Sequence, residues 1–88
     1  MNVRYEKSFA KDLGNIREKS LLKRVKHVID EVKNADNIQE ISSLKKLKGY
    51  ETFYRIKFGD YRVGIEVVNN EIIFTRFLHR KEIYRFFP

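Results

Sequence analysis

The sequence predicts a single α+β domain over residues 1–88, in which a small antiparallel β-sheet packs against an N-terminal helical hairpin. Three observations lead to this class. A chain of 88 residues buries too little apolar surface to build two separate cores. Apolar residues in the first half recur at helical spacing, whereas from Leu44 onward they follow the pattern of strands. The expected order is β-α-α-β-β-β with a short C-terminal helix, and the hairpin covers one face of the sheet.

The first half is expected to contain a short strand and two helices. Residues 2–6 form the strand, and Ser8 is expected to cap a short helix that Gly14 weakens. A longer helix is expected over residues 20–34, because its apolar residues recur every three or four positions. These residues are Leu21, Leu22, Val25, Val28, Ile29 and Val32. Residues 35–43 are mostly polar and predict a loop with room for one helical turn.

The second half predicts three antiparallel strands, over residues 53–58, 61–68 and 71–78. Each is rich in β-branched and aromatic residues, which favour strands. The pairs Gly59-Asp60 and Asn69-Asn70 separate them, and both pairs tolerate the positive φ of tight turns. The three strands therefore neighbour one another in chain order, as a meander.

A two-residue loop at Gly59-Asp60 determines which residues lie opposite each other. Counting outward from the loop places Lys57 opposite Arg62 and Arg55 opposite Gly64. One face of these two strands is then apolar and belongs against the helices. Its members are Tyr54, Ile56, Phe58, Tyr61, Val63, Ile65 and Val67. The other face is basic, and its members are Arg55, Lys57, Arg62, Gly64 and Glu66.

The facing pair Lys57 and Arg62 is an unusual feature of the basic face. Like charges directly opposite each other destabilise a sheet, so a bound phosphate is one explanation of the pair. Gly64 has no side chain and is expected to leave room for a ligand beside Arg55. The alternative is that both long side chains extend into solvent without any ligand. Glu66 is expected to pair diagonally with Arg55.

The last strand and the C-terminus are expected to extend the basic face. Counting across the second turn places His79 on the same face as Arg62, together with Ile73, Thr75 and Phe77. The same count turns Arg76 toward the core, and an inward arginine is explained only if its side chain extends past the edge of the sheet. A bulge would change the count. A short helix is expected from about residue 80 to residue 87. Arg80 and Tyr84 are four residues apart and so lie on one side of a helical turn.

The charge distribution narrows the class of partner. The formal net charge is +7, and residues 45–88 hold ten Lys or Arg against five acids, whereas residues 1–44 hold nine against seven. This excess favours a polyanion such as nucleic acid, the ribosome or an acidic protein segment.

There is no cysteine, which excludes disulfides, thiolate metal sites and cysteine nucleophiles. No apolar run is long enough for a membrane span or signal peptide, so a cytoplasmic location is expected. His27, beside the apolar stripe of its helix, is expected to be solvated surface.

Several motifs of the second half resemble one known family. They are Leu47-Lys48-Gly49, then Tyr54-Arg55-Ile56, then Gly59-Asp60-Tyr61-Arg62-Val63, and finally His79-Arg80-Lys81-Glu82-Ile83-Tyr84. In this order and spacing they resemble the RelE/ParE toxin superfamily. The detailed match covers residues 47–84, and the first 46 residues resemble that fold in pattern only.

The resemblance implies a type II toxin that enters the ribosomal A site, cleaves messenger RNA and is silenced by a cognate antitoxin. Arg55 and Lys57 fall where members place basic strand residues, and Arg62 matches the Arg that follows a Tyr. Arg80 and Tyr84 match an Arg and a Tyr near the C-terminus. The antitoxin is expected to be acidic or amphipathic, and either to cover the basic face or to displace the C-terminal segment.

Cleavage by a 2′-hydroxyl requires that a proton be removed and that charge be stabilised on the phosphate. Arg62 and Arg55 suit the phosphate because guanidinium groups are permanently charged and bidentate. Lys57 is assigned the role of base, on the expectation that basic neighbours lower its pKa. Arg55 departs from members that carry Lys there, so the identity of the base is open. Glu66 is the single acid on this face, too few for a metal site, and no cofactor is expected.

The remaining candidates serve the leaving group and the RNA chain. Arg80 or His79 is expected to assist the departing 5′-oxygen, although members of the family differ at His79. Tyr84 is expected to stack on a base or to orient the RNA. Lys48 and Lys81, which belong to the matched motifs, are expected to bind RNA phosphates.

Two other functions compete with the ribonuclease. A ParE-like member of the same superfamily would inhibit DNA gyrase and cut no RNA, although such a protein would not need to retain the basic positions. A binding module without catalysis would bind RNA or the ribosome with a steep salt dependence and leave the RNA intact.

Overall fold

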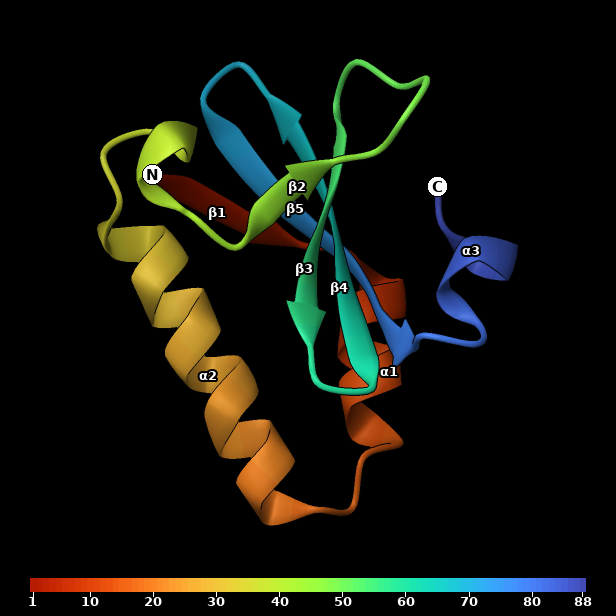
Figure 1. Ribbon diagram of the computed structural model, residues 1–88. Coiled ribbons are helices and arrows are strands. Elements are labelled where there is room, and N and C mark those ends of the chain that lie inside the picture. The colour runs from red at the N-terminus through yellow and green to blue at the C-terminus, as the bar shows by residue number, and fades with distance from the viewer.

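A five-stranded sheet forms the centre of the computed structural model, which describes residues 1–88 (Figure 1). The first half of the chain supplies an edge strand and the helices. In chain order these elements are β1 (Asn2–Tyr5), α1 (Lys7–Gly14), α2 (Lys19–Asn34) and the 3-10 helix η1 (Ile38–Glu40). The second half supplies the rest of the sheet and a terminal helix. These elements are β2 (Leu44–Lys46), β3 (Phe53–Phe58), β4 (Tyr61–Val68), β5 (Glu71–His79) and α3 (Ile83–Phe86).

The predicted α+β class is confirmed, and the sheet is larger than predicted. The strand order is β1-β5-β4-β3-β2. Three neighbouring pairs are antiparallel, but β1 runs parallel to β5, with Asn2 opposite Glu71 and Tyr5 opposite Phe74. The additional strand, β2, begins at Leu44, where the strand-like pattern of the sequence also begins. Its pairing with β3 extends the sheet on the side opposite β1.

The helical hairpin covers one face of the sheet, as Figure 1 shows. The apolar stripe of α2 places Leu21, Val25 and Val32 in the core, and α1 contributes Phe9. From the sheet, the buried members of this core are Ile56, Phe58, Val63, Ile65, Ile72, Phe74 and Phe77. Burial of these side chains is the main source of stability, because hydrophobic burial is the dominant favourable contribution to folding.

The pairing of β3 with β4 follows the predicted register residue by residue. Lys57 lies opposite Arg62, and Arg55 lies opposite Gly64. Gly59 has a φ of 62°, which a glycine adopts without strain in a tight turn. Because the loop has two residues, it leaves no freedom to shift the strands.

The start of α1 differs from the prediction. The helix begins at Lys7 and its N-cap position is Glu6, so Ser8 is not the cap. Instead the Ser8 hydroxyl donates a hydrogen bond to the carbonyl oxygen of Thr75, at 2.6 Å. The side chain that seemed to begin a helix therefore connects the helix to the sheet.

A β-bulge in β5 changes which residues share a face. The register shifts beside the Gly64–Ile65 step, so that Ile65 pairs with Phe74 while Gly64 pairs with Arg76. Thr75 is the additional residue, and its hydroxyl donates to the carbonyl oxygen of Gly64 at 2.9 Å. Residues beyond the bulge therefore lie on the face opposite to the one predicted for them.

Two predictions for β5 are corrected by this bulge. His79 and Phe77 lie opposite Tyr61 and Val63, on the helix-covered face, and not beside Arg62. Arg76 is not turned inward, because it lies opposite Gly64 at the edge of the sheet.

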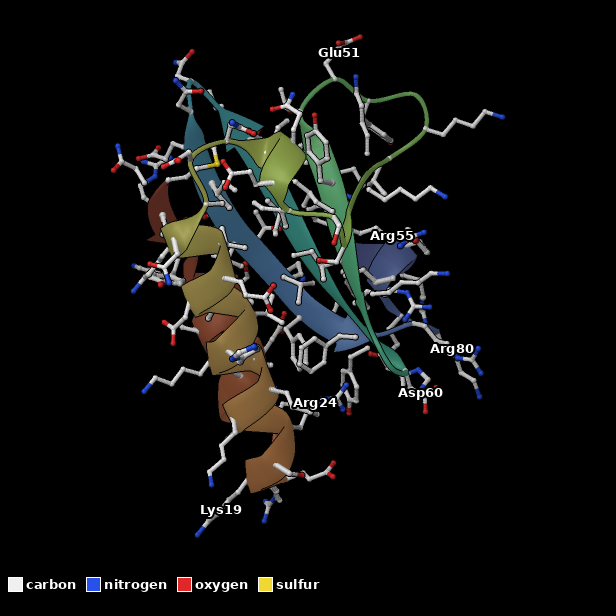
Figure 2. The ribbon with its side chains drawn as sticks, turned by 60° about the vertical axis from the view of Figure 1, so that its left-hand side comes forward. Lys19, Arg24, Glu51, Arg55, Asp60 and Arg80 are labelled. Atoms are coloured by element: carbon white, nitrogen blue, oxygen red, sulfur yellow. The ribbon has the colours of Figure 1, made fainter.

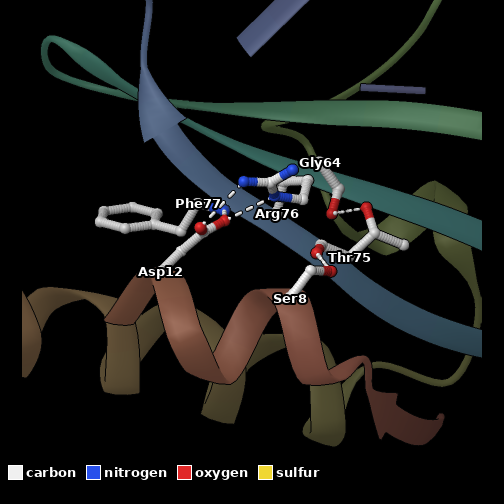
Figure 3. A network of polar contacts seen from close by, with 6 residues as sticks. All are labelled: Ser8, Asp12, Gly64, Thr75, Arg76 and Phe77. Carbon is white, nitrogen blue, oxygen red and sulfur yellow. Dashed lines mark hydrogen bonds and ion pairs between the residues drawn. The ribbon is translucent and has the colours of Figure 1, made fainter. Parts of the chain in front are cut away.

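Helix α1 completes the hydrogen bonding of the β5 edge where β1 ends (Figure 3). Beyond Phe74 the edge has no strand partner, and the peptide N–H of Phe77 donates to the Asp12 carboxylate at 2.9 Å. The guanidinium of Arg76 donates to both oxygens of the same carboxylate, at 2.8 and 3.0 Å. The hydrogen bond with Asp12 raises the pKa of Arg76 above its ordinary value. Asp12 is the one buried charged side chain, and these three hydrogen bonds explain how it is accommodated.

Candidate functional site

The face of the sheet opposite the hairpin carries two rows of cross-strand neighbours. The first row runs through Lys45, Arg55, Gly64 and Arg76, and the second through Lys57, Arg62 and Leu78. Residues directly opposite each other in a sheet point to the same side, so four cations and Arg76 share this face. We call it the open face, because no helix of the hairpin covers it.

The C-terminal segment, residues 83–88, lies on part of the open face. Its apolar residues Ile83 and Phe87 are buried, and Phe87 is only 4% exposed. A Cβ atom placed on Gly64 would lie 2.8 Å from the Phe87 ring, so the ring fills the space above the glycine. The expectation that Gly64 leaves room for a ligand is therefore wrong. Close contact with Phe87 explains the glycine.

Arg62 is held by the turn that precedes it. Its Nη1 atom donates to the carbonyl oxygens of Gly59 and Tyr61, each at 2.8 Å. These carbonyl groups compensate the guanidinium charge opposite Lys57, so a bound phosphate is not needed to explain the pair. The other N–H groups of Arg62 make no hydrogen bond within the protein and are available to an anion.

Arg80 lies at the same turn. Its peptide N–H donates to the carbonyl oxygen of Asp60 at 2.7 Å, and its Nε atom lies 3.8 Å from an Asp60 carboxylate oxygen. Figure 2 shows Arg80 and Arg55 on the same side of the molecule as the C-terminal segment. The structure thus gathers Lys57, Arg62 and Arg80 around one end of the β3–β4 hairpin.

A hollow of about 480 Å³ lies where the C-terminal segment faces β2 and the turn that follows it. We call it the basic hollow. Its lining residues are Lys45, Lys46, Leu47, Lys48, Tyr50, Arg55, Tyr84, Phe87 and Pro88. No acidic residue lines it. The structure therefore brings three of the predicted RNA-binding residues, Lys48, Arg55 and Tyr84, to one concave surface.

Other predicted residues lie outside this arrangement. His79 packs edge-on against the ring of Tyr61, with ring centroids 5.6 Å apart, and its Nδ1 atom accepts a hydrogen bond from the peptide N–H of Lys81. The Lys81 side chain is exposed just beyond the strand. Glu66 accepts a hydrogen bond from Thr52 at 3.4 Å and forms no ion pair with Arg55, contrary to expectation.

The contribution of β2 and its turn emerges only from the structure. The sequence pattern does not single out Lys45, Lys46 and Tyr50, although the run from residue 45 to residue 50 holds three lysines and a tyrosine. The density of cations beside an aromatic residue was the available signal. By itself this density does not show that the segment adds a strand next to Arg55.

Three further features complete the description of the molecule. His27 is a largely exposed side chain 3.4 Å from Glu31, which confirms that it belongs to the solvated face of α2. None of the helices has the length and hydrophobicity of a membrane-spanning segment. No three His, Asp or Glu side chains form a group that could hold a metal ion.

A family model and several known proteins are similar to this chain. The model described as ParE toxin of the type II toxin–antitoxin system parDE matches residues 3–84. The toxin RelE3 of Methanocaldococcus jannaschii is 45% identical, over the full length of both chains. The solved RelB–RelE antitoxin–toxin complex of Methanococcus jannaschii contains a chain with a TM-score of 0.79 and 43% identity, covering 97% of this chain and 99% of that one. The archaeal RelE–RelB complex of Pyrococcus horikoshii contains a chain with a TM-score of 0.72 and 24% identity, covering 90% of this chain and 93% of that one. This second likeness is one of fold alone.

Proposed function

The chain belongs to the RelE/ParE superfamily of type II toxins, and from this premise we propose that it cleaves messenger RNA in the ribosomal A site. The observation that carries the proposal is the gathering of Lys57, Arg62 and Arg80 around one turn, beside a basic hollow that contains Tyr84. A set of cations beside an aromatic ring suits a single strand of RNA, because the cations can bind its phosphates and the ring can stack on its bases.

In the proposed reaction the 2′-oxygen of one nucleotide attacks the adjacent phosphorus atom. A bond forms between the 2′-oxygen and phosphorus, and the bond between phosphorus and the 5′-oxygen breaks. The proton of the 2′-hydroxyl passes to a base, and the departing 5′-oxygen receives a proton. The products are a 2′,3′-cyclic phosphate and a free 5′-hydroxyl, so no redox change and no additional reactant are required.

We assign these steps to residues of the open face. Lys57 takes the proton of the 2′-hydroxyl, while Arg62 and Arg55 bind the phosphate as its charge increases. Arg80 assists the leaving oxygen, because it lies at the same turn as Arg62 whereas His79 lies on the other face. Tyr84 stacks on a base, with Lys48 and Lys81 as contacts for neighbouring phosphates.

A cognate antitoxin is the proposed protein partner. The similar toxins of M. jannaschii and P. horikoshii were solved in complex with RelB antitoxins. A second hollow of this chain lies between α2 and β3. Its lining includes the apolar residues Val28, Ile56 and Phe58, the cations Lys23, Arg24 and Lys57, and one acid, Glu31. This combination would accept an acidic amphipathic segment.

The test is a cell-free translation reaction in which new mRNA 5′ ends are mapped by primer extension. Cuts on translated message are expected with the parent protein and not in a control without ribosomes. Lys57→Ala should lower the single-turnover rate about 10²- to 10⁴-fold, which is the usual contribution of a general base. Lys19→Ala is the matched control, since it removes the same charge from an exposed site at the far end of α2 (Figure 2). Equal rates for parent and Lys57→Ala would contradict the assignment.

Gyrase inhibition is the second candidate, because the matching family model is that of the ParE toxins. A supercoiling assay run beside the translation assay separates the two. Inhibited gyrase with intact message would place the protein with the gyrase inhibitors. Salt-dependent RNA binding with neither activity would leave a binding module.

A further inference from the structure

Tyr50 is an exposed aromatic side chain held in a fixed position. It is 46% exposed and follows Gly49, whose φ of 85° directs the turn after β2. The rings of Tyr50 and Phe53 form a T-shaped contact, with an interplanar angle of 82° and centroids 5.6 Å apart. The turn is closed by the peptide N–H of Leu47, which donates to the carbonyl oxygen of Phe53 at 2.8 Å. A ring fixed in this way can receive another ring at little entropic cost.

The surroundings of Tyr50 favour an anion. It shares the basic hollow with Lys45, Lys48 and Arg55, and none of these three forms an ion pair within the protein. Lys46 does meet an acid, Glu51, but at 3.7 Å and at an almost fully exposed carboxylate, where such pairs contribute little. Aromatic rings combined with uncompensated cations are the usual composition of surfaces that bind single-stranded nucleic acid.

An aromatic chain connects Tyr50 to the C-terminal segment. The Phe53 ring, which contacts Tyr50, also meets the Phe87 ring edge-on, with centroids 5.5 Å apart. Phe87 is fixed against Gly64, and its segment carries Tyr84, which is 59% exposed. The two exposed tyrosines of the hollow are therefore mounted on one packed unit, which fixes their relative positions.

We propose that Tyr50 stacks on a nucleobase of the bound RNA, in a nucleotide subsite separate from that of Tyr84, with Lys45 and Lys48 binding the phosphate of that nucleotide. The subsite rests on the proposed ribonuclease function and extends it. It gives the RNA a second point of attachment away from Lys57 and Arg62, and so influences which nucleotides flank the cleaved bond.

The experiment measures binding and cleavage separately. Binding uses fluorescence anisotropy with a short 2′-O-methyl oligoribonucleotide, which cannot be cleaved, and a series in which one nucleotide at a time is abasic. Cleavage is the single-turnover rate on ribosomes programmed with different codons. The variants are Tyr50→Ala and Tyr50→Phe. The matched control is Tyr5→Ala, because Tyr5 is 48% exposed and also packs on a phenylalanine but lies in β1, outside the basic hollow.

Tyr50→Ala should weaken binding about 5- to 100-fold, the range for loss of one stacked base, while Tyr50→Phe and Tyr5→Ala stay within about twofold of the parent. One abasic position should weaken binding by the parent and leave Tyr50→Ala unaffected. The parent should cleave codons that differ at the stacked position at different rates, and Tyr50→Ala should reduce this difference.

Equal binding by Tyr50→Ala and the parent would overturn the subsite, even if the parent cleaves mRNA as proposed. A loss that every abasic probe shares equally would also overturn it, because the ring would then act on RNA as a whole. Unchanged RNA binding with weakened binding of an acidic antitoxin peptide would assign the hollow to the protein partner. A parent that binds no RNA and cleaves none would remove the proposed function together with the subsite.

Discussion

The two faces of the sheet are covered in very different ways. On one face, α1 and α2 bury thirteen hydrophobic residues in a continuous core. On the other, only the short C-terminal segment lies on the sheet, and just Ile73, Ile83 and Phe87 are buried outside that core. Most of the cations considered for function lie on or beside this second face.

The difference shows how a small basic domain can keep a cationic site. Uncompensated charges close together cost free energy, which the hydrophobic burial on the first face must offset. The helix-covered side of the sheet differs, because its one buried charge, that of Asp12, is compensated by three hydrogen bonds from Arg76 and Phe77. Substitutions on the first face should therefore affect folding, and substitutions on the second face should affect function.

The largest expected effect is that of Phe74→Ala. Phe74 is fully buried and packs against Tyr5 and Phe9, so its truncation should lower the free energy of unfolding by about 3–5 kcal/mol. Phe86→Ala, on the C-terminal segment, is the matched control, because that ring is 52% exposed and should cost less than about 1 kcal/mol. Chemical denaturation followed by circular dichroism measures both. Similar losses for the two would break the comparison.

Asp12→Ala comes next, with an expected loss of about 2–3 kcal/mol. The substitution leaves the peptide N–H of Phe77 without its acceptor. It also leaves Arg76, which is only partly exposed, without its counter-ion. Asp30→Ala removes the same side chain from an exposed position of α2 and should be nearly neutral. Thermal and urea unfolding should rank the two in this order, and a stable Asp12→Ala protein would show that β5 does not depend on α1 at this edge.

Gly64→Ala should cost about 1–2 kcal/mol, since the added methyl group would lie 2.8 Å from the Phe87 ring. The terminal segment is expected to move away from the sheet, which should raise hydrogen exchange in α3. The rate of RNA cleavage should fall by more than the loss of folded protein accounts for. Gly14→Ala is the control, because nothing lies within 4 Å of its added atom and a helix favours alanine. The double variant with Phe87→Ala should be no less stable than Phe87→Ala alone. Additive losses would mean that Phe87 does not lie over Gly64 in solution.

The smallest effect is expected for Arg24→Ala, at about 0.5–1 kcal/mol. The Arg24 guanidinium lies 4.6 Å from the centre of the Phe58 ring, a cation–π contact at the exposed border of the helix-covered face. Stability should fall by this amount while RNA cleavage stays at the parent rate, as measured by denaturation and primer extension. A large loss of cleavage would extend the functional surface onto α2.

Local pattern was sufficient for much of the fold. The spacing of Leu21, Val25 and Val32 predicted α2, and the two-residue loop at Gly59-Asp60 predicted the pairing of Lys57 with Arg62. These features depend on residues close together in the chain, and helix periodicity and turn geometry are properties of such short segments. The basic character of the face around Lys57 and Arg62 followed from the same reasoning.

Contacts between distant segments decided the rest. The bulge at Thr75, which moved His79 to the other face, is accompanied by hydrogen bonds from β5 to Ser8 and Asp12 of α1. The space above Gly64 is filled by Phe87, and the same segment places Tyr84 in the basic hollow. These partners are separated by more than twenty residues in the chain, and nothing in local spacing specifies which of many possible long-range contacts forms. Only the packing of the whole chain selects them, because each polar group at the sheet edge and each apolar side chain must find its partner at once.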